Sequence, residues 1–368
     1  DFYSAIGPIS LGYGYDVVDQ AVRDQLDKGM TFSLMHHLEY EVCQLLHEII
    51  PNAESIRISK SGADVCTAAV RIARAHTRRE RILCCGYHGW HDWYIGTSTR
   101  DAGIPEATKG LTQKIAYNNL EDLQSKLTPD TAALILEPFV FDAPDEGYLQ
   151  RVHELCKANG TLLIFDEMWT GFKIALGGAQ EYFGVTPDLA VYSKAVANGM
   201  PVAYLTGRAE VMKHFEDDVF FFTTFGGEAL SLAATIATIQ EMKKVNFAQR
   251  LDEIGTLLKD GLNKLIGAHG LTDHLHCNGY PCRTILNLSG IDNPLEMYAF
   301  IQQEMVRCGL LWSKFHNITY AFTEEDIAYT LEVYDHVLPL VKARIEAGDV
   351  ADHLRGQPFD VVFRKTKF

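Results

Sequence analysis

The stretch that decides the fold class is Thr161-Leu162-Leu163-Ile164-Phe165-Asp166-Glu167. Four consecutive apolar residues are followed at once by two carboxylates, and such runs are typical of strands buried on both faces of a parallel sheet. Similar short apolar segments occur at 55–59, 81–85, 132–136, 189–193 and 202–205. Helical patterns lie between them at 17–28, 39–50, 63–76, 119–127 and 147–159. This alternation predicts an α/β fold built on a large, mostly parallel sheet.

The pattern changes after about residue 245. A long amphipathic helix is expected at 247–266, then a strand at 282–288, a helix at 295–307, a strand at 318–321 and a helix at 323–346. Helices on an antiparallel sheet indicate a smaller α+β domain. We therefore expect a large domain over 31–245 and a small C-terminal domain over 246–368, with residues 1–30 contributing to the small one.

Composition and charge exclude several classes of function. The chain has 368 residues and a formal net charge of 33 − 48 = −15, which disfavours nucleic-acid and membrane-surface partners. It has no apolar run long enough to cross a bilayer and no signal peptide, and it opens without Met, so we expect residues upstream of Asp1. The eight cysteines are scattered through apolar segments, which predicts reduced thiols and a cytoplasmic protein.

Polar side chains follow several of the predicted strands. These are Asp166 after 162–165, Lys194 after 189–193, Tyr87 and His88 after 81–85, Glu137 after 132–136, and the turn Ser61-Gly62-Ala63 after 55–59. Because ligands of an open parallel sheet bind outside the carboxyl ends of its strands, we expect these residues to gather at one edge.

The residue types at this edge point to one cofactor. A lysine removed from water at a strand end becomes a nucleophile able to form a Schiff base, and a small-residue turn that opens a helix binds phosphate. An acid keeps a pyridine nitrogen protonated, and an aromatic side chain stacks on its ring. Together they predict pyridoxal phosphate (PLP). Each residue also has a plainer explanation: Ser61 or Asp166 as a helix cap, Lys194 exposed to solvent, Tyr87 as core.

Competing sites lack their defining residues. The run into Asp166-Glu167 looks like a Walker B strand, but neither G-x-x-x-x-G-K-[ST] nor G-x-G-x-x-G is present. His88 and His91, like the pair His36-His37, are not completed to four zinc ligands at usual spacings. We therefore expect no metal.

The motifs, taken in order, resemble a known family. They are Ile58-Ser59-Lys60-Ser61-Gly62-Ala63-Asp64-Val65, Gly86-Tyr87-His88-Gly89-Trp90, Leu136-Glu137-Pro138, the segment 162–172, Ser193-Lys194, the segment 223–230 and the segment 321–327. This set is similar to the class-III, fold-type I PLP-dependent aminotransferases, most closely to their glutamate-1-semialdehyde 2,1-aminomutase-like branch. The resemblance covers nearly the whole chain and implies a seven-stranded sheet in the large domain.

The resemblance also implies roles for individual residues. Lys194 would hold PLP as the internal aldimine and move the substrate proton, and Asp166 would pair with the pyridinium. Tyr87 would stack on one ring face, and Met168 would pack on the other. The remaining expected cofactor contacts are Ser61, Gly62, Ala63, His88, Glu137 and Thr224. Thr224 would reach the phosphate of a neighbouring subunit, which implies a homodimer with its active site at the interface.

Some positions depart from the family pattern. Ala63 replaces the usual Ser or Thr, Lys60 stands where Asn is common, and Glu228-Ala229 replaces Asn-Pro. The N-terminal segment of the true aminomutases is absent from this sequence, and the stretch after Tyr87-His88 is shorter than their gating region.

Three hypotheses for function result. The first is an aminotransferase that takes an amino group from a donor, with glutamate as the expected one, and gives it to an oxo acceptor by ping-pong chemistry. A sugar-like carbonyl compound, a short oxo acid and an aldehyde are the candidate acceptors. The alternatives are the intramolecular amino transfer of glutamate 1-semialdehyde and a catalytically silent PLP-binding protein.

Overall fold

The computed structural model describes residues 1–139 and 141–358 of the chain, so the last ten residues of the expected small domain lie outside the described part. The chain divides into two compact units. The large unit contains residues 14–139 and 144–245, and the small unit contains 1–13, 141–143 and the described residues from 246 onward.

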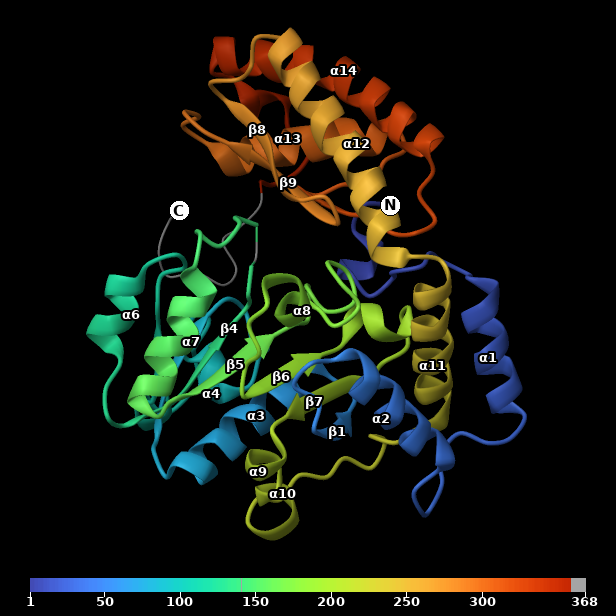
Figure 1. The fold of residues 1–368 in the computed structure, drawn as a ribbon. Coiled ribbons are helices and arrows are strands. Elements are labelled where there is room, and N and C mark those ends of the chain that lie inside the picture. The colour runs from blue at the N-terminus through green and yellow to red at the C-terminus, as the bar shows by residue number, and fades with distance from the viewer. Residues whose placement is uncertain (140, 359–368) are drawn as a thin grey trace. The chain divides into compact units, whose positions relative to one another are not determined.

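The large unit is built on a seven-stranded sheet, as expected (Figure 1). Its strands, in spatial order, are β1 (Ser55–Ser59), β7 (Ala203–Gly207), β6 (Leu189–Tyr192), β5 (Leu162–Asp166), β4 (Thr131–Leu136), β2 (Arg81–Cys85) and β3 (Thr112–Lys114). The pairs β2–β3, β2–β4, β4–β5 and β5–β6 are parallel, and β7 runs antiparallel to both β6 and β1. The carboxyl ends of β2, β4, β5 and β6 therefore lie at one edge.

Helices cover this sheet and alternate with its strands, and each helix predicted in the large unit is present. They are α1 (Asp16–Leu26), α2 (His37–Ile49), α3 (Gly62–Thr77), α4 (Asp92–Ile95), α5 (Glu106–Lys109), α6 (Leu120–Lys126), α7 (Tyr148–Asn159), α8 (Ala179–Phe183), α9 (Ala209–Met212), α10 (His214–Asp217) and α11 (Ala229–Lys244). A short 3-10 helix, η2 (Lys194–Ala197), directly follows β6. Helix α7 ends at Gly160, whose φ of 66° is the left-handed conformation that glycine adopts readily at a helix end.

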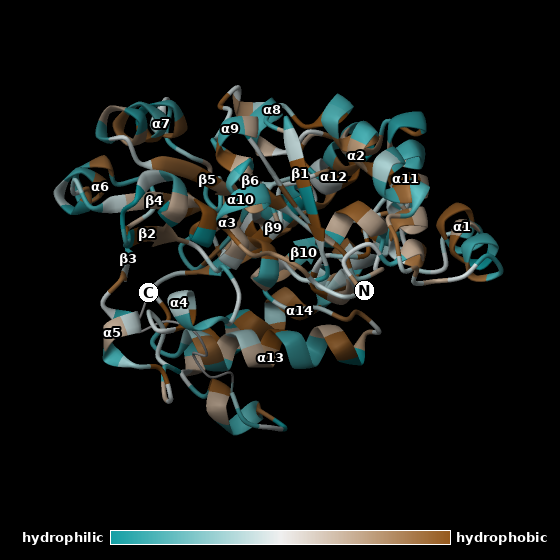
Figure 2. Ribbon diagram, turned by 90° about the horizontal axis from the view of Figure 1, so that it is seen from below, coloured by the Kyte–Doolittle hydropathy of each residue, from teal (hydrophilic) through white to brown (hydrophobic). Residues whose placement is uncertain are grey.

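The core of the large unit explains why the strands are apolar throughout. Leu162 and Ile164 of β5 belong to the hydrophobic cluster that includes the buried side of α3. Because side chains alternate along a strand, Leu163 and Phe165 point to the opposite face, and they too are fully buried. In Figure 2 strand β5 is coloured as hydrophobic, whereas helices α6 and α7 show hydrophilic as well as hydrophobic residues.

The small unit is an α+β unit with a three-stranded antiparallel sheet in the order β10-β9-β8. Its elements are η1 (Ser4–Ile6), α12 (Phe247–Ala268), β8 (Leu275–Tyr280), β9 (Arg283–Leu288), α13 (Pro294–Arg307), β10 (Phe315–Asn317), α14 (Glu324–Ala347) and η3 (Val350–His353). The strand predicted at 318–321 lies three residues earlier in the structure, where β10 spans Phe315–Asn317. The backbone amides of Ile318 and Tyr320 donate to the carbonyls of Cys282 and Ser10, so they lie beyond the ladder that β10 forms with β9.

In the described parts of the chain, no helix combines the length and the apolarity that are needed to cross a membrane.

Candidate active site

Lys194 follows strand β6 after a single residue, and its side chain turns back toward the end of the neighbouring strand β5. Its Nζ lies 3.4 Å from the centroid of the Trp169 ring, which is three residues beyond Asp166. Its φ of 49° is in the left-handed region, which a lysine adopts only where the surrounding structure imposes it. The turn at the end of β6 therefore directs the amine toward the segment that follows Asp166, and the residue as a whole is half-buried.

Asp166 is a buried carboxylate that accepts hydrogen bonds on both oxygens. Its Oδ2 accepts from Nδ1 of His88 at 2.7 Å and from the thiol of Cys66 at 3.7 Å, and its Oδ1 accepts from the backbone N–H of Met168 at 3.1 Å. Burial and the nearby Asp166 raise the pKa of the Cys66 thiol well above its ordinary value, which keeps the S–H donor in place. Three groups from α3, from the segment after β2 and from the segment after β5 thus orient one carboxylate.

His88 is held inside the large unit by aromatic neighbours. Its side chain is fully buried, its ring stacks with that of Trp93 at 6.3 Å between centroids, and it meets Tyr94 edge-on at 5.2 Å. Since Nδ1 faces the carboxylate, Nε2 is left buried without a hydrogen-bond partner among the described residues. The neighbouring His91 bonds the hydroxyl of Thr67 at 2.7 Å, so these two imidazoles face different groups.

The turn at the start of α3 has the predicted form, and Ser61 caps the helix. The Ser61 hydroxyl accepts from the backbone N–H of Asp64 at 3.3 Å, and the Asp64 carboxylate accepts from the backbone N–H of Ser61 at 3.1 Å. This reciprocal pair is the plainer role that the sequence left open for Ser61. Gly62 lies against Met168, because a Cβ at this position would be 2.9 Å from the Met168 sulfur. The start of α3 and the segment after Asp166 are therefore packed together.

Tyr87 and Glu137 meet at the ends of β2 and β4. The Glu137 Oε2 accepts from the backbone N–H of Tyr87 at 3.0 Å, and the Glu137 side chain is buried. Gly86 has a φ of 114°, and a Cβ there would overlap the Glu137 carboxylate. The hydroxyl of Tyr94 donates to the carbonyl of Gly86 at 2.7 Å. The Tyr87 side chain remains 44% exposed, as a ring that receives a ligand would need to be.

Thr224 is the predicted site residue that does not lie at the end of a strand. It is exposed on the segment between α10 and α11, among three aromatic side chains that are 79%, 71% and 59% exposed: Phe220, Phe222 and Phe225. The structure thus brings together the predicted residues at the ends of β1, β2, β4, β5 and β6, and it leaves Thr224 on the surface of the large unit.

Sequence reasoning missed two residues of the cluster, Trp169 and Cys66. Trp169 contacts the Lys194 amine, and Cys66 donates to Asp166. The spacing of Trp169 from Asp166 was a usable signal, because a side chain so close to a strand end reaches the same edge of the sheet. Cys66 had no such signal, since a cysteine on the buried side of a helix reads as ordinary core.

The residues that the structure brings together fit pyridoxal phosphate. An oriented carboxylate, an amine one strand away, a half-exposed tyrosine and a helix N-terminus at Gly62 are the donor set that this group requires. The end of the Met168 side chain lies where a Cβ at Gly62 would stand, so glycine lets the start of α3 pack against Met168 without displacing it.

Comparisons with known proteins agree with this chemistry. The family model described as "Aminotransferase class-III" matches residues 1–280. The chain is 34% identical to a 3-aminobutyryl-CoA aminotransferase of Cloacimonas acidaminovorans, over 93% of this chain and 85% of that protein. It is 30% identical to a glutamate-1-semialdehyde 2,1-aminomutase of Syntrophobacter fumaroxidans, over 93% and 86%. Among solved structures, an omega-transaminase from Sphaerobacter thermophilus has a TM-score of 0.87 at 22% identity, over 93% of this chain and 87% of that chain.

Proposed function

Because the chain belongs to the class-III aminotransferase family, whose cofactor is pyridoxal phosphate, we propose that it moves an amino group from a small amino donor to an oxo acceptor. The observation that carries the proposal is the placement of Asp166 and Lys194 at the ends of the neighbouring strands β5 and β6. Three hydrogen-bond donors orient the Asp166 carboxylate, and the Lys194 amine lies over the indole ring of Trp169.

The residues of the cluster would have distinct roles in such a transfer. Bound pyridoxal phosphate supplies an electron sink for the bond that breaks at the substrate carbon. Asp166, oriented by His88 and Cys66, would hold the proton on the ring nitrogen. Lys194 would bind the cofactor aldehyde and, once displaced by the substrate amine, carry the proton to and from the reacting carbon. Tyr87 and Met168 would pack on the ring, and the start of α3 with Ser61, Gly62 and Ala63 would hold the phosphate.

The first test is cofactor attachment. The protein incubated with pyridoxal phosphate should gain a visible absorbance band, and borohydride should fix the cofactor to Lys194, as read by peptide mass spectrometry. Lys194→Ala should fold and lose roughly a thousandfold in kcat, whereas Lys243→Ala, at an exposed ion pair with Glu48, should keep the wild-type rate. A colourless wild-type protein, or a Lys194→Ala enzyme with near-normal turnover, contradicts the assignment.

The substrates are the finer part of the proposal. We expect glutamate as donor and a sugar-like carbonyl compound, a short oxo acid or an aldehyde as acceptor. The relative named 3-aminobutyryl-CoA aminotransferase adds a β-amino acyl thioester to the panel. Each donor is supplied alone, and the change in cofactor absorbance is recorded. A donor that converts the cofactor without an acceptor present supports a two-stage transfer.

The aminomutase alternative rests on the aminomutases among the relatives. It predicts that glutamate 1-semialdehyde alone, with no second substrate, yields an isomeric amino acid at a sustained rate. Product that appears only when a separate donor and acceptor are supplied favours the aminotransferase.

We further propose a homodimer in which Thr224 completes the site of the other subunit. Its support is an apolar surface on the large unit, where Leu34 and Met35 are 85% and 79% exposed and lie on the segment before α2. The carbonyl of Met30 accepts from the backbone N–H of Ala229 at 2.8 Å, so this segment is tied to the one that carries Thr224.

We also propose a cytoplasmic location. The eight cysteines are all free thiols, which supports placing the protein in the reducing cytoplasm.

Subunit mixing tests this arrangement. Thr224→Ala and Lys194→Ala should each be weak as pure enzymes. In a mixed dimer, the subunit that keeps Lys194 would receive Thr224 from its neighbour. One of the two sites would then be complete, so each mixed dimer should have about half of the activity of a wild-type dimer. Recovery to no more than the average of the two pure variants contradicts a role for Thr224 across the interface.

A further inference from the structure

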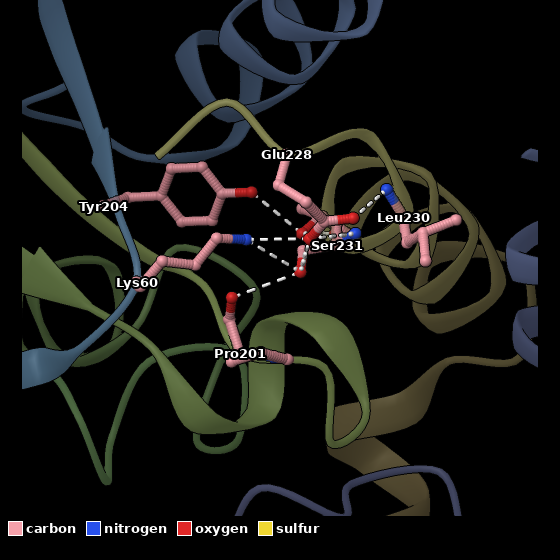
Figure 3. A network of polar contacts seen from close by, with 7 residues as sticks. Lys60, Pro201, Tyr204, Glu228, Leu230 and Ser231 are labelled. Carbon is pink, nitrogen blue, oxygen red and sulfur yellow. Dashed lines mark hydrogen bonds and ion pairs between the residues drawn. The ribbon is translucent and has the colours of Figure 1, made fainter. Parts of the chain in front are cut away.

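A partly buried ion pair joins Lys60 to Glu228 in the large unit. The Lys60 Nζ lies 2.9 Å from Glu228 Oε2 and donates to Ser231 Oγ at 3.0 Å. The two charged side chains are 21% and 14% exposed, so water screens them only weakly. Figure 3 shows the ammonium of Lys60 pointing into the group formed by Glu228 and Ser231 at the start of α11.

Each member of the pair has a second attachment. The Glu228 carboxylate caps α11 by accepting from the backbone N–H groups of Leu230 at 2.5 Å and Ser231 at 3.3 Å. The Ser231 hydroxyl lies 2.7 Å from Glu228 Oε2 and 3.1 Å from the carbonyl of Pro201. Burial alone raises the pKa of the Glu228 carboxyl, but the hydrogen bonds from Lys60 and Ser231 outweigh it and hold that pKa below its ordinary value.

The network thereby joins three segments that carry the proposed cofactor contacts. Lys60 is the residue before the turn Ser61-Gly62-Ala63. Pro201 lies in the loop between η2, which begins at Lys194, and β7. Glu228 ends the segment that contains Thr224, and this segment lies on β1, because a Cβ at Gly226 would be 2.9 Å from the carbonyl of Ile58.

Two departures from the family pattern are thus in contact with each other. A lysine replaces an uncharged residue in front of the turn, and an acid replaces an uncharged residue in front of α11. Either charge alone would be partly buried without a partner, which is costly, whereas the pair is neutral. Both substitutions therefore belong to one feature of this chain.

We propose that Lys60 and Glu228 are positioning residues for the cofactor: their ion pair holds the turn 61–63, the loop after Lys194 and the segment before α11 in one arrangement. The proposal rests on the assignment of pyridoxal phosphate. Neither residue needs to touch the cofactor. Loss of either partner frees the three segments to move relative to one another, and the cofactor dissociates more easily.

The test measures binding of pyridoxal phosphate to apoenzyme, with no substrate present. Lys60→Met and Glu228→Gln each remove one charge, and the amide oxygen of Gln keeps an acceptor for the start of α11. Each should raise the Kd for pyridoxal phosphate at least tenfold, mainly through faster release. The double variant should resemble either single one, because all three lack the same interaction. Lys243→Met, which breaks the exposed pair with Glu48, is the matched control and should leave Kd unchanged.

The outcomes separate positioning from general stabilisation. If Lys60→Met and Glu228→Gln bind pyridoxal phosphate with a Kd within twofold of wild type, the proposal is overturned, whether or not the melting temperature of the apoenzyme falls. It is also overturned if the increases in Kd of the two single variants multiply in the double variant. Lys60→Arg, which keeps the charge, should restore Kd to within about threefold of wild type. If Lys60→Met does not fold, Ser231→Ala decides: it removes the link to Pro201 and should raise Kd about threefold, and an unchanged Kd rejects the proposal. A wild-type protein that binds no pyridoxal phosphate refutes the cofactor assignment instead.

Discussion

At the scale of single residues, Gly86 fixes the geometry between the ends of β2 and β4. Its φ of 114° is unfavourable for any residue with a Cβ, and the Glu137 carboxylate occupies the space that a Cβ would need. Gly86→Ala should lower the free energy of unfolding by roughly 2–4 kcal/mol, through backbone strain and overlap together. It should also weaken pyridoxal phosphate binding, because Glu137 holds the backbone of Tyr87.

Gly103 provides the matched control for this prediction. It also has a positive φ, of 88°, but open space surrounds its would-be Cβ. Gly103→Ala should therefore cost only about 1 kcal/mol. Urea unfolding of both variants measures how much the overlap with Glu137 contributes. If both variants lose the same free energy of unfolding, the overlap has no effect.

The residues at the strand ends were predictable from the sequence, and their cross-chain partners were not. An apolar run that stops at Asp166 or before Lys194 shows where a polar side chain must emerge, because the strand is buried on both faces. The Lys60–Glu228 pair joins positions 168 apart, and no local pattern reports such a contact. The contacts of Cys66 and Trp169 belong to the same class, since they depend on how α3 and the segment after β5 pack.

At the scale of elements, Glu167 ties the segment after β5 to α8. Its fully buried carboxylate accepts from the backbone N–H groups of Ala179 at 2.9 Å and Gln180 at 3.1 Å, and from the Thr170 hydroxyl. Burial raises its pKa from 4.5 to about 7. The folded protein therefore holds this proton more tightly than the unfolded chain does. Between about pH 4.5 and pH 7 the contribution of Glu167 to stability should fall by about 3 kcal/mol as the pH rises.

Glu167→Gln isolates this contribution. The variant cannot titrate, so its unfolding free energy should fall less than that of wild type between pH 4.5 and pH 7. Its amide also replaces one acceptor oxygen with a donor, so we expect a loss of roughly 1–3 kcal/mol at any pH. Denaturant unfolding at several pH values measures both effects, and parallel curves for the two proteins would exclude a titrating Glu167.

Element boundaries were predictable where the chain carries an explicit stop signal. Asn159-Gly160 ends α7, and the run from Leu162 begins β5, as the sequence indicated. Strand β8 was missed because Asn278-Gly279, a typical turn signal, interrupts the alternation of buried and exposed residues within Leu275–Tyr280. The apolar residues near 318 suggested a strand, but the backbone there bonds to the N-terminal segment, which lies far away in the sequence.

At the scale of the whole molecule, the two units should respond differently to acid. In the small unit, His316 is fully buried, with Nε2 within 2.6 Å of the Tyr334 hydroxyl and Nδ1 within 2.8 Å of the Thr284 hydroxyl. Burial lowers its pKa from 6.5 to about 3. The unfolded chain thus binds a proton that the folded unit does not, and the small unit should lose stability as the pH falls from about 6.5 toward 3.

Hydrogen exchange read by mass spectrometry can follow the units separately. Between pH 7 and pH 5, protection should fall in α14 and β9 of the small unit and should be kept in β5. His316→Gln should reduce this pH dependence even though the variant is less stable overall. Equal loss of protection in both units would show that His316 does not set the acid response.

Trp169, whose indole lies beside Lys194, can serve as an intrinsic fluorescence probe. If Lys194 holds pyridoxal phosphate as proposed, energy absorbed by Trp169 in the ultraviolet would pass to that chromophore, so the fluorescence of Trp169 should fall as the cofactor binds. The other three tryptophans, Trp90, Trp93 and Trp312, contribute a background that a Trp169→Phe protein defines. Cofactor loading can therefore be followed in real time without an added dye.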